Sequence, residues 1–234
     1  MKKNGLEKSL IVKGNVELKK EVIKNNINFK EIIDTMLKEK GHYELKKRLI
    51  NQGYRLDVLI NDDDCYVRAA VAEQGYGLDI LINDINVIVR KAVVKQKYKL
   101  SKLVRDRDWI VREAVAEQGY GLDILVNDEE WTVRKVVAAQ GYSLDNLVND
   151  INVIVRRTVA EQGYGLDILV NDEEWVVRKA VAKQGYGLDV LVNDENAEVR
   201  KAVAEQGYGL DKLIHDQEPK VREAAISQLN KVNQ

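Results

Sequence analysis

The sequence of 234 residues contains a single cysteine, Cys65, and a single proline, Pro219. One cysteine excludes an internal disulfide and a cysteine-based metal cluster, and it suits a reducing compartment. Long hydrophobic runs are also missing near the N-terminus, where the apolar stretch SLIV is far too short for a signal peptide or a membrane span. We therefore expect a cytosolic protein that does not enter a membrane.

A large excess of charge of one sign is absent too, because the formal net charge is −1. This value provides no overall attraction to nucleic acid or to a membrane surface. The charge is unevenly distributed, since residues 1–50 contain 13 lysines and arginines against 7 aspartates and glutamates. The remaining residues contain 24 basic and 31 acidic side chains, so the chain beyond residue 50 is acidic.

What the chain has in abundance is repetition. Tyrosine recurs at every twenty-second position from 54 to 208, as Tyr54, Tyr76, Tyr98, Tyr120, Tyr142, Tyr164, Tyr186 and Tyr208. A fixed period of this length is typical of repeat arrays, in which each repeat is stabilised by packing on its neighbours. The interval favours one elongated array over two ordinary domains. We number each repeat from the valine of its Val-Arg pair, so that one repeat is 177–198, VRKAVAKQGYGLDVLVNDENAE.

Each repeat has the start and stop signals of a helix. Position 20 is a good N-cap residue in five repeats: Asp64, Asn86, Asp108, Asn152 and Asn196. Position 9 is usually glycine, which suits the left-handed residue that ends a helix. We predict a first helix of about ten residues and a short second helix of about seven residues. The predicted core face of the first helix comprises Val177, Ala180, Val181 and Gln184.

The tyrosine that follows the glycine has a structural explanation. At this place an apolar side chain folds back onto the last turn of the helix, here onto the valine at position 5. A role of the tyrosines in ligand binding is the alternative interpretation.

An aspartate at position 18 is followed six residues later by an arginine in all eight repeats. The aspartates are Asp62, Asp84, Asp106, Asp128, Asp150, Asp172, Asp194 and Asp216, and the arginines are Arg68, Arg90, Arg112, Arg134, Arg156, Arg178, Arg200 and Arg222. A catalytic acid is not needed eight times. We interpret these residues as a ladder, in which each aspartate accepts hydrogen bonds from helix N–H groups and from an arginine of its own or the next repeat.

The pattern D-x5-R, with VRxAVA and the following LxxLxxD, resembles the HEAT-like repeats and above all the variant leucine-rich repeat, over residues 45–234. The resemblance implies a right-handed stack of short helix pairs that serves as a binding surface. Two features depart from the family, since the 22-residue period is shorter than usual and QGYG replaces a proline-containing link. The cysteine cluster of some family members is absent, so the resemblance implies no iron–sulfur centre.

We therefore predict an all-α fold, a right-handed α-solenoid of about eight to nine short helix-pair repeats with divergent capping ends. Residues 1–44 are predicted to form a basic N-terminal cap with one degenerate repeat, because LKKEVIKN at 18–25 aligns with LKKRLINQ at 45–52. The segment 45–220 is predicted to form eight 22-residue repeats, and 221–234 a C-terminal capping helix.

Function is expected at solvent-facing positions that differ between repeats, which on the first helix are positions 21, 3 and 7. All three tryptophans occupy position 21: Trp109, Trp131 and Trp175. Position 3 is mostly basic and includes Lys91, Lys135 and Lys179. Such a stripe predicts a protein-binding surface, since exposed tryptophans dominate the energetics of interfaces. Alternatively, each tryptophan packs sideways on its neighbour as a wedge between repeats.

The repeat at 89–110 departs most from the pattern. Six basic residues are concentrated there between positions 95 and 107: Lys95, Lys97, Lys99, Lys102, Arg105 and Arg107. Lys97 replaces the glycine of position 9, and a lysine in a left-handed conformation costs about 1 kcal/mol relative to glycine. The segment is interpreted as a site for phosphate or for an acidic partner, or else as the solvated face of a drifting repeat.

No catalytic set is recognisable in the sequence. The two histidines, His42 and His215, lie near opposite ends of the repeat array, and there is no glycine-rich phosphate loop, nucleophile elbow or metal-ligand spacing. The paired glutamates before Trp131 and Trp175 are explained by the positive end of the helix dipole. We therefore expect a protein that is not an enzyme and has no metal, cofactor or small-molecule substrate.

The leading hypothesis is a scaffold that binds a protein through the aromatic and basic face. One alternative is a nucleic-acid binder that uses residues 95–107, whose affinity should fall steeply with salt. Another is an inhibitor of a macromolecular machine, such as a phage counter-defence protein. A DNA glycosylase with HEAT-like repeats, which uses tryptophans, an aspartate and a basic groove, is disfavoured by the period and by the lack of a unique aspartate.

Overall fold

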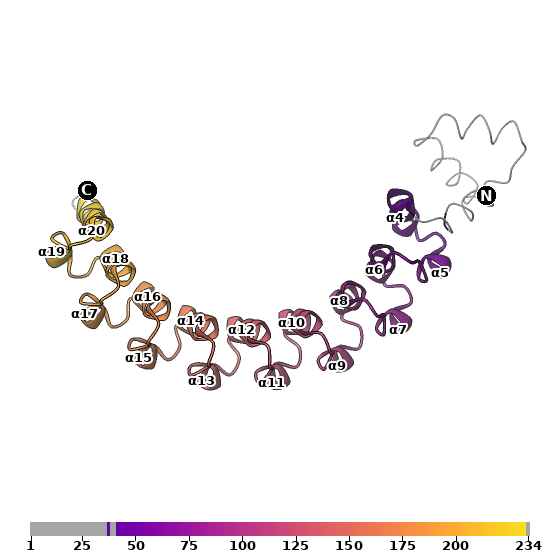
Figure 1. Ribbon diagram of the computed structural model, residues 1–234, viewed down its shortest axis with the longest axis horizontal. Coiled ribbons are helices and arrows are strands. Elements are labelled where there is room, and N and C mark those ends of the chain that lie inside the picture. The colour runs from indigo at the N-terminus through magenta and orange to yellow at the C-terminus, as the bar shows by residue number, and fades with distance from the viewer. Residues whose placement is uncertain (1–36, 38–40, 233–234) are drawn as a thin grey trace, which may run out of the picture. The chain divides into compact units, whose positions relative to one another are not determined.

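The computed structural model describes Leu37 and residues 41–232 (Figure 1). The chain forms two compact units, Met1–Tyr98 and Lys99–Gln234. Every regular element in the described residues is a helix, and successive helices pack on one another, which confirms the predicted all-helical α-solenoid fold. None of the helices in this part of the chain is long and apolar enough to cross a membrane. The predicted N-terminal cap, 1–44, lies almost entirely outside the described residues.

In the first unit, longer and shorter helices alternate along the chain. The longer ones are α4 (Tyr43–Asn51), α6 (Cys65–Glu73) and α8 (Val87–Lys95), and the shorter ones are α5 (Leu56–Leu59) and α7 (Leu78–Leu81). The second unit continues the same alternation. Its longer helices are α10 (Trp109–Glu117), α12 (Trp131–Ala139), α14 (Val153–Glu161), α16 (Trp175–Lys183), α18 (Ala197–Glu205) and α20 (Pro219–Val232). Its shorter helices are α9 (Leu100–Leu103), α11 (Leu122–Leu125), α13 (Leu144–Leu147), α15 (Leu166–Leu169), α17 (Leu188–Leu191) and α19 (Leu210–Leu213).

The second unit is curved. Its longer helices lie side by side along the concave side of this curve, and its shorter helices lie along the convex side (Figure 1). The longer helices α10, α12, α14, α16, α18 and α20 are similarly oriented, so their first residues all lie at the same end. Side chains at one repeat position form a row across the unit.

The longer helices begin where the N-cap residues predict. Asp108 accepts a hydrogen bond from the backbone N–H of Ile110 at 3.0 Å, and Asn152 accepts one from Ile154 at 2.9 Å. Helix α20 begins at Pro219, the place where proline is tolerated because its missing N–H is not needed. Helices α12 and α16 are different, because the glutamates that precede them form no side-chain cap.

The longer helices also end as predicted. Gly119 is left-handed, with φ of 69°. Its N–H donates to the carbonyl of Ala116 at 2.8 Å, and the N–H of Tyr120 donates to the carbonyl of Val115 at 3.4 Å. These two bonds form a Schellman motif, which explains the fixed place of glycine and tyrosine in the repeat.

Both helices are shorter than predicted. Helix α16 has 9 residues and α17 has 4, against the expected ten and seven. A second left-handed residue directly before each short helix, such as Gly187 with φ of 60°, takes up part of the expected length. A Cβ atom on Gly187 would lie 2.5 Å from Cγ2 of Val170, so this glycine lets consecutive short helices approach closely.

The core confirms most of the predicted face. Val177, Ala180 and Val181 are buried, together with Leu191 and Val192 of the neighbouring segment. The prediction for Gln184 is wrong, because this residue is exposed at the end of α16. Its amide instead donates to the carbonyl of Glu161 at 3.1 Å, at the end of the preceding long helix.

Candidate protein-interaction surface

The Asp–Arg ladder connects successive repeats. In the second unit, Arg156 donates from Nε and Nη2 to the two carboxylate oxygens of Asp172, at 2.7 and 3.0 Å. Its Nη1 donates to the backbone carbonyl of Asp150 at 2.9 Å. The carboxylate is thus bound by the arginine that precedes it in its own repeat, whereas the arginine six residues later takes the backbone carbonyl. Within the second unit the pairs are Arg112–Asp128, Arg134–Asp150, Arg156–Asp172, Arg178–Asp194 and Arg200–Asp216.

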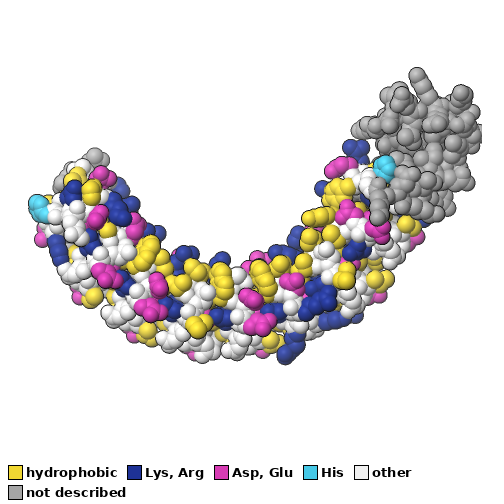
Figure 2. Space-filling model, in the orientation of Figure 1, with side chains coloured by type: hydrophobic (Ala, Val, Ile, Leu, Met, Phe, Trp, Pro, Cys, Tyr) yellow, Lys and Arg dark blue, Asp and Glu magenta, His cyan; other side chains and the backbone are white. Residues whose placement is uncertain are grey.

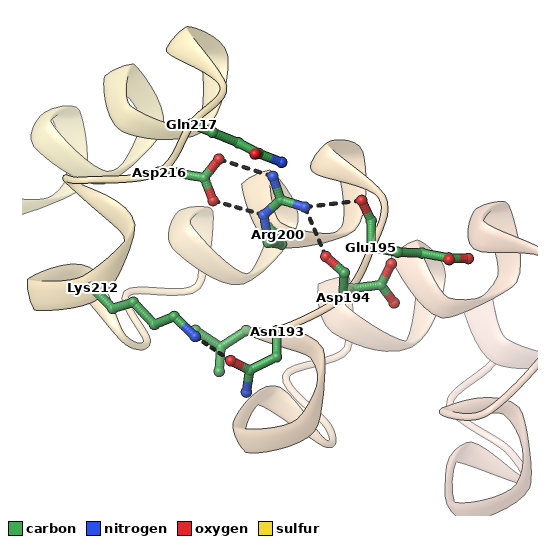
Figure 3. A pocket seen from close by; sticks show the side chains of 8 residues that line it. Asn193, Asp194, Glu195, Arg200, Lys212, Asp216 and Gln217 are labelled. Atoms are coloured by element: carbon green, nitrogen blue, oxygen red, sulfur yellow. Dashed lines mark hydrogen bonds and ion pairs between the residues drawn. The ribbon is translucent and has the colours of Figure 1, made fainter.

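Figure 3 shows this arrangement at Arg200, between Asp216 and the backbone oxygens of Asp194 and Glu195. The hydrogen bond from Arg200 outweighs burial and lowers the pKa of the Asp216 carboxyl. These groups line an open hollow of about 390 Å³, where Lys212 also donates to Asn193. Because Arg200 and Asp216 are already bound to each other, the ladder has a structural role at this edge of the repeats.

The three tryptophans lie at the starts of long helices in the second unit. Trp109, Trp131 and Trp175 are the first residues of α10, α12 and α16. Each is 37% exposed, so most of each residue is covered while part of it stays open to solvent. Their exposure lies between the two arrangements that the sequence leaves open, an exposed anchor and a buried wedge.

Smaller apolar residues continue the line of tryptophans. Val153 is the first residue of α14 and is half-buried, as are the apolar second residues of α10, α14 and α16. We call this set the tryptophan row: Trp109, Ile110, Trp131, Val153, Ile154, Trp175 and Val176. Figure 2 shows exposed hydrophobic side chains along the concave edge of the second unit, with lysine and arginine side chains next to them. The sequence prediction named only the tryptophans of this row. The other members could have been found from their apolar character at positions 21 and 22 of the repeat.

A row of cations runs parallel to the tryptophan row. We call Lys135, Arg157 and Lys179 the basic row, because each lies four residues after the first residue of α12, α14 or α16. The ammonium group of Lys179 lies 5.8 Å from the centroid of the Trp175 ring, a cation–π distance. Lys135 is exposed and forms no ion pair with any described residue. The two rows therefore form one apolar and basic strip on the concave side.

Acidic side chains lie beside the basic row at both ends, although the equivalent residue on α18 is Lys201, which forms an ion pair with Glu205 at 3.6 Å. On α10 the equivalent position is Glu113. Next to α16, Glu198 of α18 accepts from Lys179 at 2.7 Å and from Lys220 at 2.8 Å. These two hydrogen bonds lower the pKa of Glu198 to about 2, so the carboxylate is charged at neutral pH.

The basic segment around residue 97 is divided between the two units. Lys91, Lys95 and Lys97 belong to the first unit, where Lys95 forms an ion pair with Glu73 at 3.0 Å. Lys97 has φ of 54°, which confirms its predicted left-handed conformation. Four further residues belong to the second unit and are exposed: Lys99, Lys102, Arg105 and Arg107.

Comparison with models of protein families and with curated proteins gives no match for this chain. The ladder repeats the same internal bonds, whereas the tryptophan row and the basic row differ from repeat to repeat and face solvent. The strip formed by these two rows is the candidate functional site.

Proposed function

We propose that the protein is a non-enzymatic repeat scaffold that binds a protein partner through the tryptophan row and the basic row. The observation that carries the proposal is that three tryptophans occupy one repeat position on the concave side and stay 37% exposed. Tryptophan is among the residues that contribute most to binding energy at protein interfaces. The open part of each side chain and the adjacent cations supply the apolar centre and the polar rim of such an interface.

The fold itself gives little reason for tryptophan at this position. Position 21 is occupied by Val87, Val153 and Ala197 in other repeats, and each of these residues also begins a nine-residue helix. A requirement of the repeat would be expected in every copy, as it is for the ladder. The large aromatic side chain is therefore better explained by a contact outside the chain.

We extend the proposal to the family and the compartment. The 22-residue pattern supports a place among the HEAT-like and variant leucine-rich repeats, and the single cysteine supports a cytosolic protein. An inhibitor of a macromolecular machine would be a special case of the same scaffold, since it also binds a protein.

Nucleic-acid binding is the second candidate, and the exposed Lys99, Lys102 and Arg105 favour it. The composition of the second unit does not, because residues 99–234 contain 18 lysines and arginines against 24 aspartates and glutamates. A phosphate backbone would be repelled by most of this unit.

The two candidates are separated by affinity capture with the full chain, with and without nuclease, from the cells that encode it. We expect a protein that is retained after nuclease treatment and at high salt, and that is lost with Trp131→Ala. The matched control is Ile168→Ala, which removes an exposed apolar side chain from α15 instead. Capture that disappears with nuclease and is unaffected by Trp131→Ala contradicts the proposal in favour of nucleic acid.

A further inference from the structure

We propose that the partner segment is an α-helix with acidic side chains on one flank of its apolar face, lying across α10, α12, α14 and α16. This inference rests on the proposed function, because it names the kind of segment that the same strip binds. It follows from the spacing of the two rows and from the charges on each side of the tryptophan row.

The spacing along the tryptophan row fits a helix. Neighbouring packed helices are about 8–10 Å apart, so successive members of the row are separated by about that distance. A partner helix rises about 1.5 Å per residue and covers about 10 Å in seven residues. An apolar residue in every seventh position would meet α10, α12, α14 and α16 in turn.

The spacing between the rows also fits a helix. Trp131 and Lys135 are separated by one turn of α12, and Trp175 and Lys179 by one turn of α16, which places the two rows about 6 Å apart. Because the partner helix runs along the rows, this distance has to be covered around its circumference, and a helix about 10–12 Å in diameter with its side chains presents two neighbouring side-chain stripes to one surface. A β-strand turns successive side chains to opposite faces, so it does not present an apolar and a charged row to the same surface at this distance.

The charges select an acidic flank. The basic row offers the exposed, unpaired Lys135 on α12 and Lys179 over Trp175 on α16. Between them, the Arg157 side chain is 38% exposed and forms an ion pair with Glu161 at 3.1 Å. Three acidic side chains at heptad spacing on the partner would pair with Lys135 and compete with Glu161 and Glu198 for Arg157 and Lys179.

At α12 and α16 the opposite flank of the tryptophan row carries the other sign. Glu130 and Glu174 directly precede Trp131 and Trp175, and the exposed Glu129 and Glu173 precede them in turn. Acidic side chains on this flank of a partner would be repelled. The partner helix therefore needs its acidic residues on one side of the apolar face only. This asymmetry distinguishes the strip from a surface that binds apolar segments non-specifically.

The test uses the full chain and synthetic helical peptides of about four heptads with one leucine per heptad. One peptide has glutamate on one flank of the leucines, a second has lysine at the same places, and a third has glutamate on both flanks. A fourth has the composition of the first with central prolines, which prevent a helix. Binding is measured by anisotropy of the labelled peptide and by emission of the protein's tryptophans.

We expect the peptide with one glutamate flank to bind at least about tenfold more tightly than each of the other three. Lys135→Glu should weaken its binding by about tenfold, because the exchange turns attraction into repulsion. The matched control is Lys212→Glu on the short helix α19, an exposed lysine outside the two rows, which should bind as the unchanged protein does.

The possible outcomes separate this inference from the proposed function. The acidic helix is overturned if the lysine peptide or the proline peptide binds as tightly as the peptide with one glutamate flank. If that binding is lost in Trp131→Ala, the strip remains a protein-binding surface. Failure of the first peptide to bind also overturns the acidic helix. The proposed function fails separately, if the captured natural partner is unaffected by Trp131→Ala.

Discussion

Arg156 and Arg157 are adjacent on α14, yet they belong to different surfaces. The Arg156 side chain is 11% exposed and is fixed between Asp172 and the carbonyl of Asp150, like the arginine of every other ladder pair in its unit. The Arg157 side chain is 38% exposed and lies in the basic row, where neighbouring repeats have different residues. The same chemical group thus serves the fold in one position, whereas in the next it pairs with Glu161 on its own helix and stays partly open to solvent.

This comparison separates residues that every repeat requires for its fold from residues that the fold does not constrain. The ladder, the N-caps and the Schellman motif recur because each repeat has to solve the same problem of joining its helices to the next pair. The tryptophan row and the basic row vary because the fold does not constrain them. Residues that differ from repeat to repeat are therefore better candidates for function than residues that recur in every repeat.

The largest expected effect is on stability, from Arg156→Ala. The exchange leaves the nearly buried Asp172 without its partner, and loss of one member of such a pair costs about 2–3 kcal/mol of unfolding free energy. Arg157→Ala is the matched control and should cost less than about 0.5 kcal/mol. Both are measured by urea unfolding. Equal losses for the two variants, or a stable Arg156→Ala that has lost its partner, would contradict the division between fold and surface.

The next largest effect is on binding, from Trp131→Ala. Loss of an anchor should cost about 2 kcal/mol or more of binding free energy and leave the thermal melt nearly unchanged. A wedge between repeats would instead cost about 3–5 kcal/mol of stability. Iodide quenching gives an independent measurement, since the open part of each indole should be accessible. A blue, unquenched emission spectrum argues for the wedge.

A smaller gain in stability is expected from Lys97→Gly. Lys97 has φ of 54°, and glycine adopts this conformation without strain, so the helix end should be stabilised by up to about 1 kcal/mol. The reverse exchange, Gly119→Lys, should cost a similar amount, because a Cβ atom there meets nothing within 4 Å and only the backbone strain counts. Thermal melts measure both. Destabilisation by Lys97→Gly would show that the lysine side chain contributes more than the strain costs.

The smallest effect is electrostatic and concerns Glu198. Lys179 and Lys220 lower its pKa to about 2, whereas a glutamate in the unfolded chain has a pKa of about 4.3. Its contribution to stability should therefore be complete above about pH 4.3 and lost only as the pH falls towards 2. NMR titration of the carboxyl carbon checks the pKa, and a normal value would show that the two lysines do not hold the group.

The same carboxylate also occupies one cation of the basic row. Glu198→Gln removes the charge that pairs with Lys179, so an acidic helix should bind a few times more tightly. Asp211→Asn, an exposed residue of the short helix α19, is the matched control. A weaker interaction for Glu198→Gln would indicate that Glu198 orients Lys179 rather than competing for it.

The residues that recur were the ones that the sequence predicted well. The N-cap at Asn152, the left-handed Gly119 and the pairing of aspartate with arginine all follow from local rules. Helical spacing predicts Gln184 in the core, but α16 ends at Lys183, so the spacing rule does not apply to it. The close approach of Gly187 to Val170 was not predicted, because it depends on how consecutive repeats pack.

The candidate site was less predictable than the fold. The position of each tryptophan at a helix start follows from the sequence, but its partial exposure depends on side chains of neighbouring repeats. Glu198 accepts hydrogen bonds from Lys179 and Lys220, and these residues lie on three consecutive long helices, α16, α18 and α20. No short-range pattern in one repeat indicates such a contact.

Because Arg156 binds Asp172 in front of it and the carbonyl of Asp150 behind it, each joint between repeats in this unit is chemically the same as the next. A gene encoding such a chain can gain or lose one whole repeat without creating an interface between repeats that lacks its Asp–Arg contacts. The segment NDEEW occurs at 127–131 and again at 171–175, two repeats apart. Duplication or deletion of a repeat between them would change the distance between Trp131 and Trp175 by the width of one repeat. The length of the binding surface can therefore evolve in increments of one repeat.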